Sequence, residues 1–125
     1  MTYIGRIDKK LYSVVSEITT DEVIITDEQI RHIKERHGDN FDDFLKYLPE
    51  ILSAPDYIIR DDKYPNTALI LKEIISEDKR VQVVLRLHTL SDVPEYKNSI
   101  ISFWEISRSR WENYLRNKKV LYKRE

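Results

Sequence analysis

The chain has 125 residues, of which 41% are hydrophobic and 34% charged, and its formal net charge is −1. This balance is typical of a globular protein and excludes an intrinsically disordered one, so we expect a single domain over residues 1–125. The absence of cysteine excludes disulfides and thiolate metal ligands. No apolar run is long enough to span a bilayer, and no signal-peptide core follows Met1. We therefore expect a cytoplasmic protein with no membrane partner.

The C-terminal end of the chain is basic. Between residues 108 and 125 there are seven basic and two acidic side chains, although the whole chain is nearly neutral. A basic end on an acidic body indicates a surface that faces nucleic acid. A solvated helix followed by an edge strand guarded by lysines explains the same pattern equally well.

The N-terminal part of the chain predicts short strands followed by two helices. Strands are expected at residues 3–7, 10–15 and 23–25, the last of them either a strand or an extended lead-in. A helix is expected over residues 26–37, begun by Thr26 in a capping-box spacing and stopped by Gly38. A second helix is expected from about Asn40, with Pro49 breaking or kinking it.

The remaining sequence predicts longer strands and one helix. The expected strands cover residues 57–60, 67–75, 80–88, 98–106 and 120–122. Short connections at residues 61–66 and 76–79 favour antiparallel hairpins, and Ser107 caps a helix that precedes the last strand. We therefore predict an α+β fold, with N-terminal helices packed on one face of a roughly four-stranded antiparallel sheet and a C-terminal helix and short final strand.

Two of the three histidines lie in the expected helix over residues 26–37. Imidazole can give or take a proton near neutral pH. His37 shares the buried stripe of this helix, whereas His32 pairs with Arg36 on another face, about 140° from His37 around the axis. A core-facing residue or a cation favoured by the helix dipole is the alternative for His37, and a solvent-exposed residue is the alternative for His32. The helix lacks a His-Glu-x-x-His pattern, so a zinc protease site is excluded.

The third histidine, His88, ends the expected strand over residues 80–88. One face of this strand is predicted to pack against the helices, and the other carries a polar row that ends in Arg86 and His88. A solvated sheet face is the usual explanation for such a row. Lys72, in the preceding strand, is either an edge-strand gatekeeper or a phosphate ligand in the same groove as Arg86.

Other residue types point to fewer functions. No Gly-x-Ser-x-Gly elbow accompanies the serines, and Ser107 is chiefly a helix cap. Trp104 and Trp111 are expected in the core, whereas Tyr64 and Tyr96 lie in polar loops where they could stack on bases. No glycine-rich phosphate loop and no carboxylate cluster at metal spacing is present. We expect no metal and no cofactor.

Several segments in collinear order across residues 22–123 resemble the phage Barnase–EndoU–Colicin–RelE-like nuclease domains, of the second described subgroup. Two of them are ITDEQIRHIKERH and VQVVLRLH, and the others cover residues 47–52, 65–68, 96–101, 103–111 and 117–122. The resemblance implies helices packed on a four-stranded antiparallel sheet, metal-independent RNA cleavage, and an origin in phages or mobile elements. Functional residues carry over to His32, His37, Arg86 and His88, and further to Lys72, Ser107 and Arg110.

The sequence and the resemblance together predict an endoribonuclease of toxin or effector type, acting in the cytoplasm of a host cell. In this mechanism the 2′-hydroxyl attacks the neighbouring phosphate and leaves a cyclic phosphate end. His32 or His37 is one proton carrier and His88 the other, so His32→Ala should abolish cleavage. The expected phosphate ligands are Arg86 with Lys72 or Arg36, and Ser107 and Arg110 join the basic tail in binding the flanking RNA.

The predicted partner is RNA, with transfer RNA or another structured RNA as candidates, and an antitoxin or immunity protein as a further candidate partner. Two other functions fit the same sequence. The chain could be a non-catalytic nucleic-acid-binding module, in which the basic residues matter and the histidines do not. It could also be a phage accessory or inhibitor protein that acts by protein contact, because a fold does not fix a function.

Overall fold

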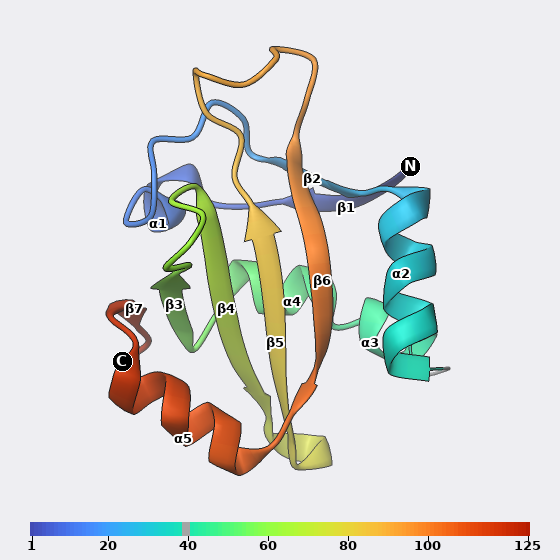
Figure 1. Cartoon of the computed structure of the whole chain (residues 1–125), viewed down its shortest axis with the longest axis vertical. Helices are drawn as coiled ribbons and strands as arrows, with labels where there is room; N and C mark the ends of the chain where they lie inside the picture. The colour runs from blue at the N-terminus through green and yellow to red at the C-terminus, as the bar shows by residue number, and fades with distance from the viewer. Residues whose placement is uncertain (39–40) are drawn as a thin grey trace.

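The computed structural model describes residues 1–38 and 41–125. Its strands are β1 (Thr2–Arg6), β2 (Glu22–Ile25), β3 (Tyr57–Arg60), β4 (Thr67–Ile74), β5 (Lys79–Arg86), β6 (Asn98–Ile106) and β7 (Val120–Lys123). Its helices are α1 (Lys9–Tyr12), α2 (Asp27–His37), α3 (Phe41–Leu45), α4 (Leu48–Ser53) and α5 (Arg108–Asn117), with a 3-10 turn, η2, at Ile75–Glu77. The strands form one sheet in the order β1-β2-β6-β5-β4-β3-β7 (Figure 1).

The α+β class is as predicted, but the sheet is larger than predicted and it is mixed. Seven strands join it instead of about four. β2 runs parallel to β6 through the pairs Val23–Asn98 and Ile24–Ser99, and the other neighbouring pairs of the described residues are antiparallel. The short strands β1, β2 and β7 attach to partners far away in sequence, so no local pattern reveals that they belong to the sheet.

The predicted strand over residues 10–15 is wrong, because α1 occupies its first half. Asp8 precedes this turn of helix, and its Oδ1 accepts hydrogen bonds from the backbone N–H of Lys10 at 2.9 Å and of Leu11. This cap stabilises a helical turn over a sequence that otherwise favours a strand. The turn delivers Tyr12 into the core, where its hydroxyl donates to the carbonyl of Leu52 at 2.7 Å.

The predicted helix over residues 26–37 is confirmed as α2. The Thr26 hydroxyl accepts a hydrogen bond from the N–H of Gln29 at 3.1 Å, and Gly38 ends the helix with a φ of 76°. The second predicted helix is divided into α3 and α4, and its expected start at Asn40 lies outside the described residues. The break predicted at Pro49 is present but falls just before it, at residues 46–47, and Pro49 lies in the first turn of α4, where a missing N–H does no harm.

The sheet has a core on each face. On the first face, here called the α4 face, Val81, Val83 and Leu85 of β5 pack against buried residues of α1, α2 and α4, as predicted. On the opposite face, called the α5 face, Leu71 and Trp104 pack with side chains of α5. In Figure 1, α4 is seen behind β4 and β5, α2 runs alongside β6, and α5 lies at the lower end of the sheet.

The lower half of the polar row on β5 is buried, contrary to the solvated face expected from its sequence. Arg80 and Gln82 are only 8% and 3% exposed, because α5 and its neighbours cover that end of the α5 face. Arg80 is paired with Glu73 at 3.1 Å and Asp78 at 3.3 Å. The Gln82 Oε1 atom is buried without a hydrogen-bond partner among the described residues.

We expect Gln82→Met to stabilise the protein by about 1 kcal/mol, because it removes a buried hydrogen-bond acceptor that is desolvated on folding and not paired with a donor. Methionine preserves the length of the side chain and can fill the same space. Thermal unfolding followed by circular dichroism measures the effect. A transition midpoint that is unchanged or lower in the variant would contradict this expectation.

Candidate functional site

Arg86 and His88, predicted to act together, line one cavity at the end of β5. This cavity of about 580 Å³ also contains Ser99, which lies opposite Arg86 on β6. The loop between β5 and β6 contributes Tyr96 and Lys97, and the cavity reaches Thr26 at the start of α2. We call it the Arg86 cavity. Arg86 lies on the α5 face, two residues beyond Val84, at the end that α5 residues do not cover.

Arg86 is held by the loop that follows β5. Its Nη1 donates to the carbonyl of Leu87, and its Nη2 donates to Oδ1 of Asp92 at 2.7 Å. The other oxygen of Asp92, Oδ2, accepts a hydrogen bond from the backbone N–H of Thr89 at 2.8 Å. This N–H and, after it, the Arg86 guanidinium hold the pKa of Asp92 below its ordinary value, against the opposing effect of burial. The guanidinium therefore has a carboxylate partner before any ligand binds.

His88 is buried, and both of its ring nitrogens are engaged. Nε2 lies 2.7 Å from the carbonyl oxygen of Val93, so it must carry the proton that is donated to that oxygen. Nδ1 bonds to the hydroxyl of Thr19. The backbone N–H of His88 donates to Oδ1 of the fully buried Asn98 at 2.8 Å. His88 thus ties the β5–β6 loop to the segment before β2, and neither nitrogen is open to a substrate.

His37 lies at a second cavity, at the C-terminal end of α2. Its ring stacks on Trp104 of β6 with 5.0 Å between centroids and 8° between planes. Burial, followed by the nearby Arg36 charge, lowers the pKa of His37 below 6.5. Its ring nitrogens have no hydrogen-bond partner within residues 1–38 and 41–125. His37 is more exposed than its place on the buried stripe predicts, because that stripe ends at the edge of the sheet.

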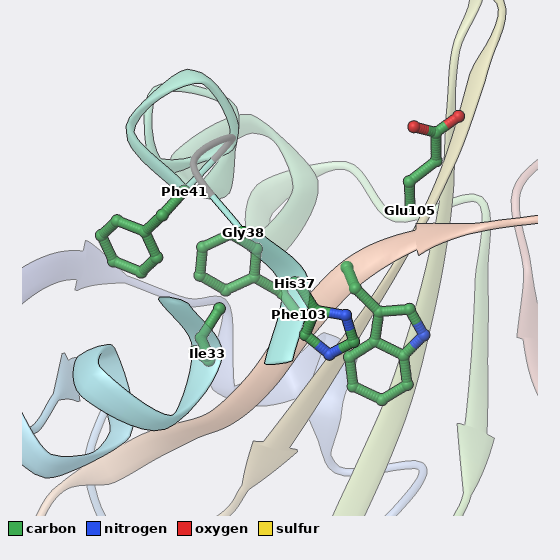
Figure 2. A pocket seen from close by; sticks show the side chains of 7 residues that line it. Ile33, His37, Gly38, Phe41, Phe103 and Glu105 are labelled. Atoms are coloured by element: carbon green, nitrogen blue, oxygen red, sulfur yellow. The ribbon is translucent and has the colours of Figure 1, made fainter. Parts of the chain in front are cut away.

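The cavity beside His37 has a volume of about 160 Å³ and is here called the His37 cavity. Glu105 of β6 lies at its rim, and Phe41 and Phe103 form part of its wall (Figure 2). An imidazole and a carboxylate are the side chains that most often transfer protons in enzymes. This cavity therefore combines two possible proton carriers with the cation of Arg36 nearby.

His32 belongs to neither of these two cavities. Its side chain is 48% exposed and lies between two acids of the same helix, 3.6 Å from Glu28 and 4.0 Å from Glu35. These contacts contribute little to stability, because all three groups are exposed to water.

The two cavities are too far apart to share one phosphodiester. Thr26 at the first end of α2 lines the Arg86 cavity, and His37 at the other end lines the His37 cavity. An 11-residue helix is about 16 Å long. Along β6, Ser99 and Trp104 are likewise separated by about 16 Å. The predicted pairing of His37 with His88 around one phosphate therefore fails on distance.

Lys72 is neither an edge gatekeeper nor a neighbour of Arg86. β4 lies between β3 and β5, and Lys72 is on the α4 face, whereas Arg86 is on the α5 face. The Lys72 side chain is 7% exposed, and its Nζ donates to the carbonyl of Ala54 at 2.7 Å and lies 3.5 Å from Asp56. This lysine therefore fastens the connection between α4 and β3.

The remaining predicted ligands lie on α5. Ser107 is the helix cap that was predicted, since its hydroxyl accepts the N–H of Arg110 at 3.1 Å. Arg110 is exposed and lines a shallow hollow together with Ser107 and Tyr114. Two cations of the basic end are already paired, Lys118 with Asp62 and Arg124 with Asp56.

Sequence reasoning missed Glu105, Asp92 and Asn98. Glu105 is one carboxylate in an alternating strand, and nothing in the sequence places it at the rim of the His37 cavity. A signal for Asp92 was present, since an aspartate three residues after Thr89 in a polar loop is typical of a side chain that bonds its own backbone. No group of three or more histidine, cysteine or acidic residues that could hold a metal occurs within the described ranges.

The chain belongs to the family described as phage-Barnase-EndoU-ColicinE5/D-RelE like nuclease2, whose model matches residues 2–123. This match makes it a member of a phage-associated nuclease family, and nucleic acid is the partner that the family indicates. No curated protein and no solved structure gave a significant match. Across the part of the chain that the structure describes, no helix is long and apolar enough to cross a membrane.

Proposed function

We propose that this protein is an endoribonuclease that cleaves RNA without a metal ion, by attack of the 2′-hydroxyl on the adjacent phosphate. The observation that carries the proposal is the stacked imidazole of His37, whose nitrogens bond to no residue in the described ranges 1–38 and 41–125 and which lies in a cavity with Glu105 and near Arg36. Intramolecular attack needs no activated water, so a proton acceptor, a proton donor and a cation suffice.

His37 takes the proton from the 2′-hydroxyl in this mechanism, and Trp104 orients the imidazole by stacking. The 2′-oxygen then bonds to phosphorus, and the bond from phosphorus to the 5′-oxygen breaks. The Arg36 guanidinium stabilises the charge that develops on the phosphate oxygens. Glu105 is the second side chain in the cavity able to carry a proton to the departing oxygen. The products are a 2′,3′-cyclic phosphate and a free 5′-hydroxyl.

The other predicted residues take different parts in this proposal. His88 positions the β5–β6 loop, because both of its nitrogens are engaged. Arg86 contacts the RNA strand away from the cleaved bond, and Arg110 and the basic end contact the flanking backbone. His32 takes no part in proton transfer in this proposal, because it lies in neither cavity and stands between two acids.

The first experiment is incubation of the purified protein with a mixed-sequence RNA in excess EDTA. We expect new fragments that end in cyclic phosphate. Cleavage that appears only after Mg²⁺ or Mn²⁺ is added would refute metal independence, and cleavage of DNA alone would refute the RNA substrate. Salt-sensitive RNA binding without any fragment would favour a binding module, and no binding at all would favour a protein that acts by protein contact.

The pH dependence of cleavage tests the role of His37 as a base. Its pKa is lowered, so the neutral, proton-accepting form persists to a lower pH than in an ordinary histidine. We expect kcat/KM to fall as the pH is lowered and His37 becomes protonated, with this acidic limb at a lower pH than an unshifted imidazole would give. The Arg36→Gln variant removes the repulsion between the Arg36 cation and a protonated His37, so the pKa of His37 rises. The acidic limb of the pH profile of kcat/KM therefore moves to higher pH. The matched control is Arg31→Gln, at an exposed position of α2. If the acidic limb of the pH profile does not move in Arg36→Gln, the role of His37 as the base is contradicted.

A further inference from the structure

The residues that line the Arg86 cavity are suited to binding a flat organic ring. Met1 and Ile24 contribute apolar surface, and Tyr96 contributes an aromatic ring that is 64% exposed. Polar and charged side chains also line the cavity, among them Arg86, Glu95 and Ser99. Cavities of this kind bind small organic groups through apolar contact and orient them with a few hydrogen bonds.

The charges of this cavity do not suit a phosphate. Arg86 is paired with Asp92 at 2.7 Å, and Lys97 is bonded to Glu22. The N-terminal amine of Met1 is paired with Asp27 at 2.9 Å. Each cation at the cavity therefore already has a carboxylate partner, and a bound anion would have to compete with that carboxylate. An uncharged ring with hydrogen-bonding edges meets no such competition.

We propose that the Arg86 cavity binds a guanine base of the RNA strand, at a nucleotide outside the bond that His37 cleaves. This inference rests on the proposed ribonuclease function. Stacking on Tyr96 holds the base, since every base offers an aromatic face. The exposed carboxylate of Glu95 accepts from the N–H groups of guanine, and the Ser99 hydroxyl and a free Arg86 N–H donate to its O6 and N7.

The position of the cavity supports a nucleotide outside the scissile bond. Ser99 and Trp104 both lie on β6, about 16 Å apart, so a strand that follows β6 from His37 reaches the Arg86 cavity. Binding of a base in the Arg86 cavity would determine which bond of the RNA lies at His37 and is cleaved. Guanine is favoured because a carboxylate and a guanidinium together match its donors and acceptors, whereas adenine lacks the acceptor O6.

The test is titration of the 15N-labelled protein with the four nucleosides and, separately, with inorganic phosphate. We expect guanosine to shift the amide signals of Lys97 and Ser99 at the lowest concentration. Glu95→Gln should bind guanosine about tenfold more weakly, the loss expected when a hydrogen bond to a charged group is weakened. Leu90→Ala, at an exposed position of the same loop outside this cavity, is the matched control.

Two outcomes overturn the proposal. One is that inorganic phosphate shifts the same amides as strongly as guanosine, and the other is that no nucleoside shifts them. His37→Ala separates this question from the cleavage reaction, because it should lose cleavage and keep guanosine binding. If RNA is cleaved in a His37-dependent manner while guanosine does not bind, the base site fails and the ribonuclease proposal stands.

Discussion

His37→Ala is expected to lower the rate of RNA cleavage by at least about 100-fold, the usual effect of removing a general acid or base. Folding should change little, because the His37 side chain is exposed and its main contact is the stack on Trp104. That stack contributes on the order of 1 kcal/mol. Single-turnover cleavage of an RNA oligonucleotide in EDTA measures the rate, and thermal unfolding checks the fold.

The comparison with His32→Ala makes this experiment decisive, because sequence reasoning gave both histidines a claim to the chemistry. The two residues lie on the same helix, but His37 lines a cavity with Glu105 and His32 does not. Full activity in His37→Ala, or a loss confined to His32→Ala, would reverse the assignment. Trp104→Phe keeps an aromatic ring under the imidazole, so it should retain more activity than Trp104→Ala.

Lys72→Met is expected to destabilise the fold by about 2 kcal/mol and to leave cleavage by the folded protein unchanged. The variant leaves the Ala54 carbonyl without its donor and removes a cation from beside Asp56. For a chain of this length, the unfolding midpoint should fall by about 5–10 °C. Lys63→Met, at an exposed position in the β3–β4 loop, is the matched control and should unfold like the unmodified protein.

The activity of Lys72→Met must be measured well below its unfolding transition. A large loss of cleavage in fully folded Lys72→Met would return this lysine to the RNA site, where the sequence pattern first placed it. An unchanged unfolding midpoint in Lys72→Met would show that the bonds of Lys72 to the α4–β3 connection contribute nothing to stability. The effect on stability and the effect on cleavage can be distinguished, because Lys72 lies on the α4 face, away from Arg86.

Much of the secondary structure could be predicted from local sequence. The helix from Thr26 to His37 has a capping threonine and a terminal glycine, and both perform the predicted roles. β6 has the predicted bounds, and β4 and β5 differ from them by one or two residues. These elements are long enough for periodicity to identify them. The turn at α1 was missed because the cap of Asp8 outweighs the strand preference of the residues that follow.

The candidate site was less predictable, since its parts come together from distant segments. The sequence identified His37 and Arg86 but could not tell that two cavities separate them. It identified His88 as a titratable group, but Thr19 and Val93 engage both nitrogens, and these partners are 69 and 5 residues away. Glu105 was missed because its position at the rim of the His37 cavity depends on how α2 packs along β6.

Local sequence was enough to predict the α+β class, the main helices and strands, the family resemblance and the residue types that could transfer protons. The alternation of polar and apolar residues along β5 also predicted which of its residues share a face. How each face of the sheet is covered follows from the tertiary structure, because it depends on where α5 packs and on the parallel pairing of β2 with β6. Those contacts join segments that are far apart in the chain, and a local pattern of residues carries no record of them.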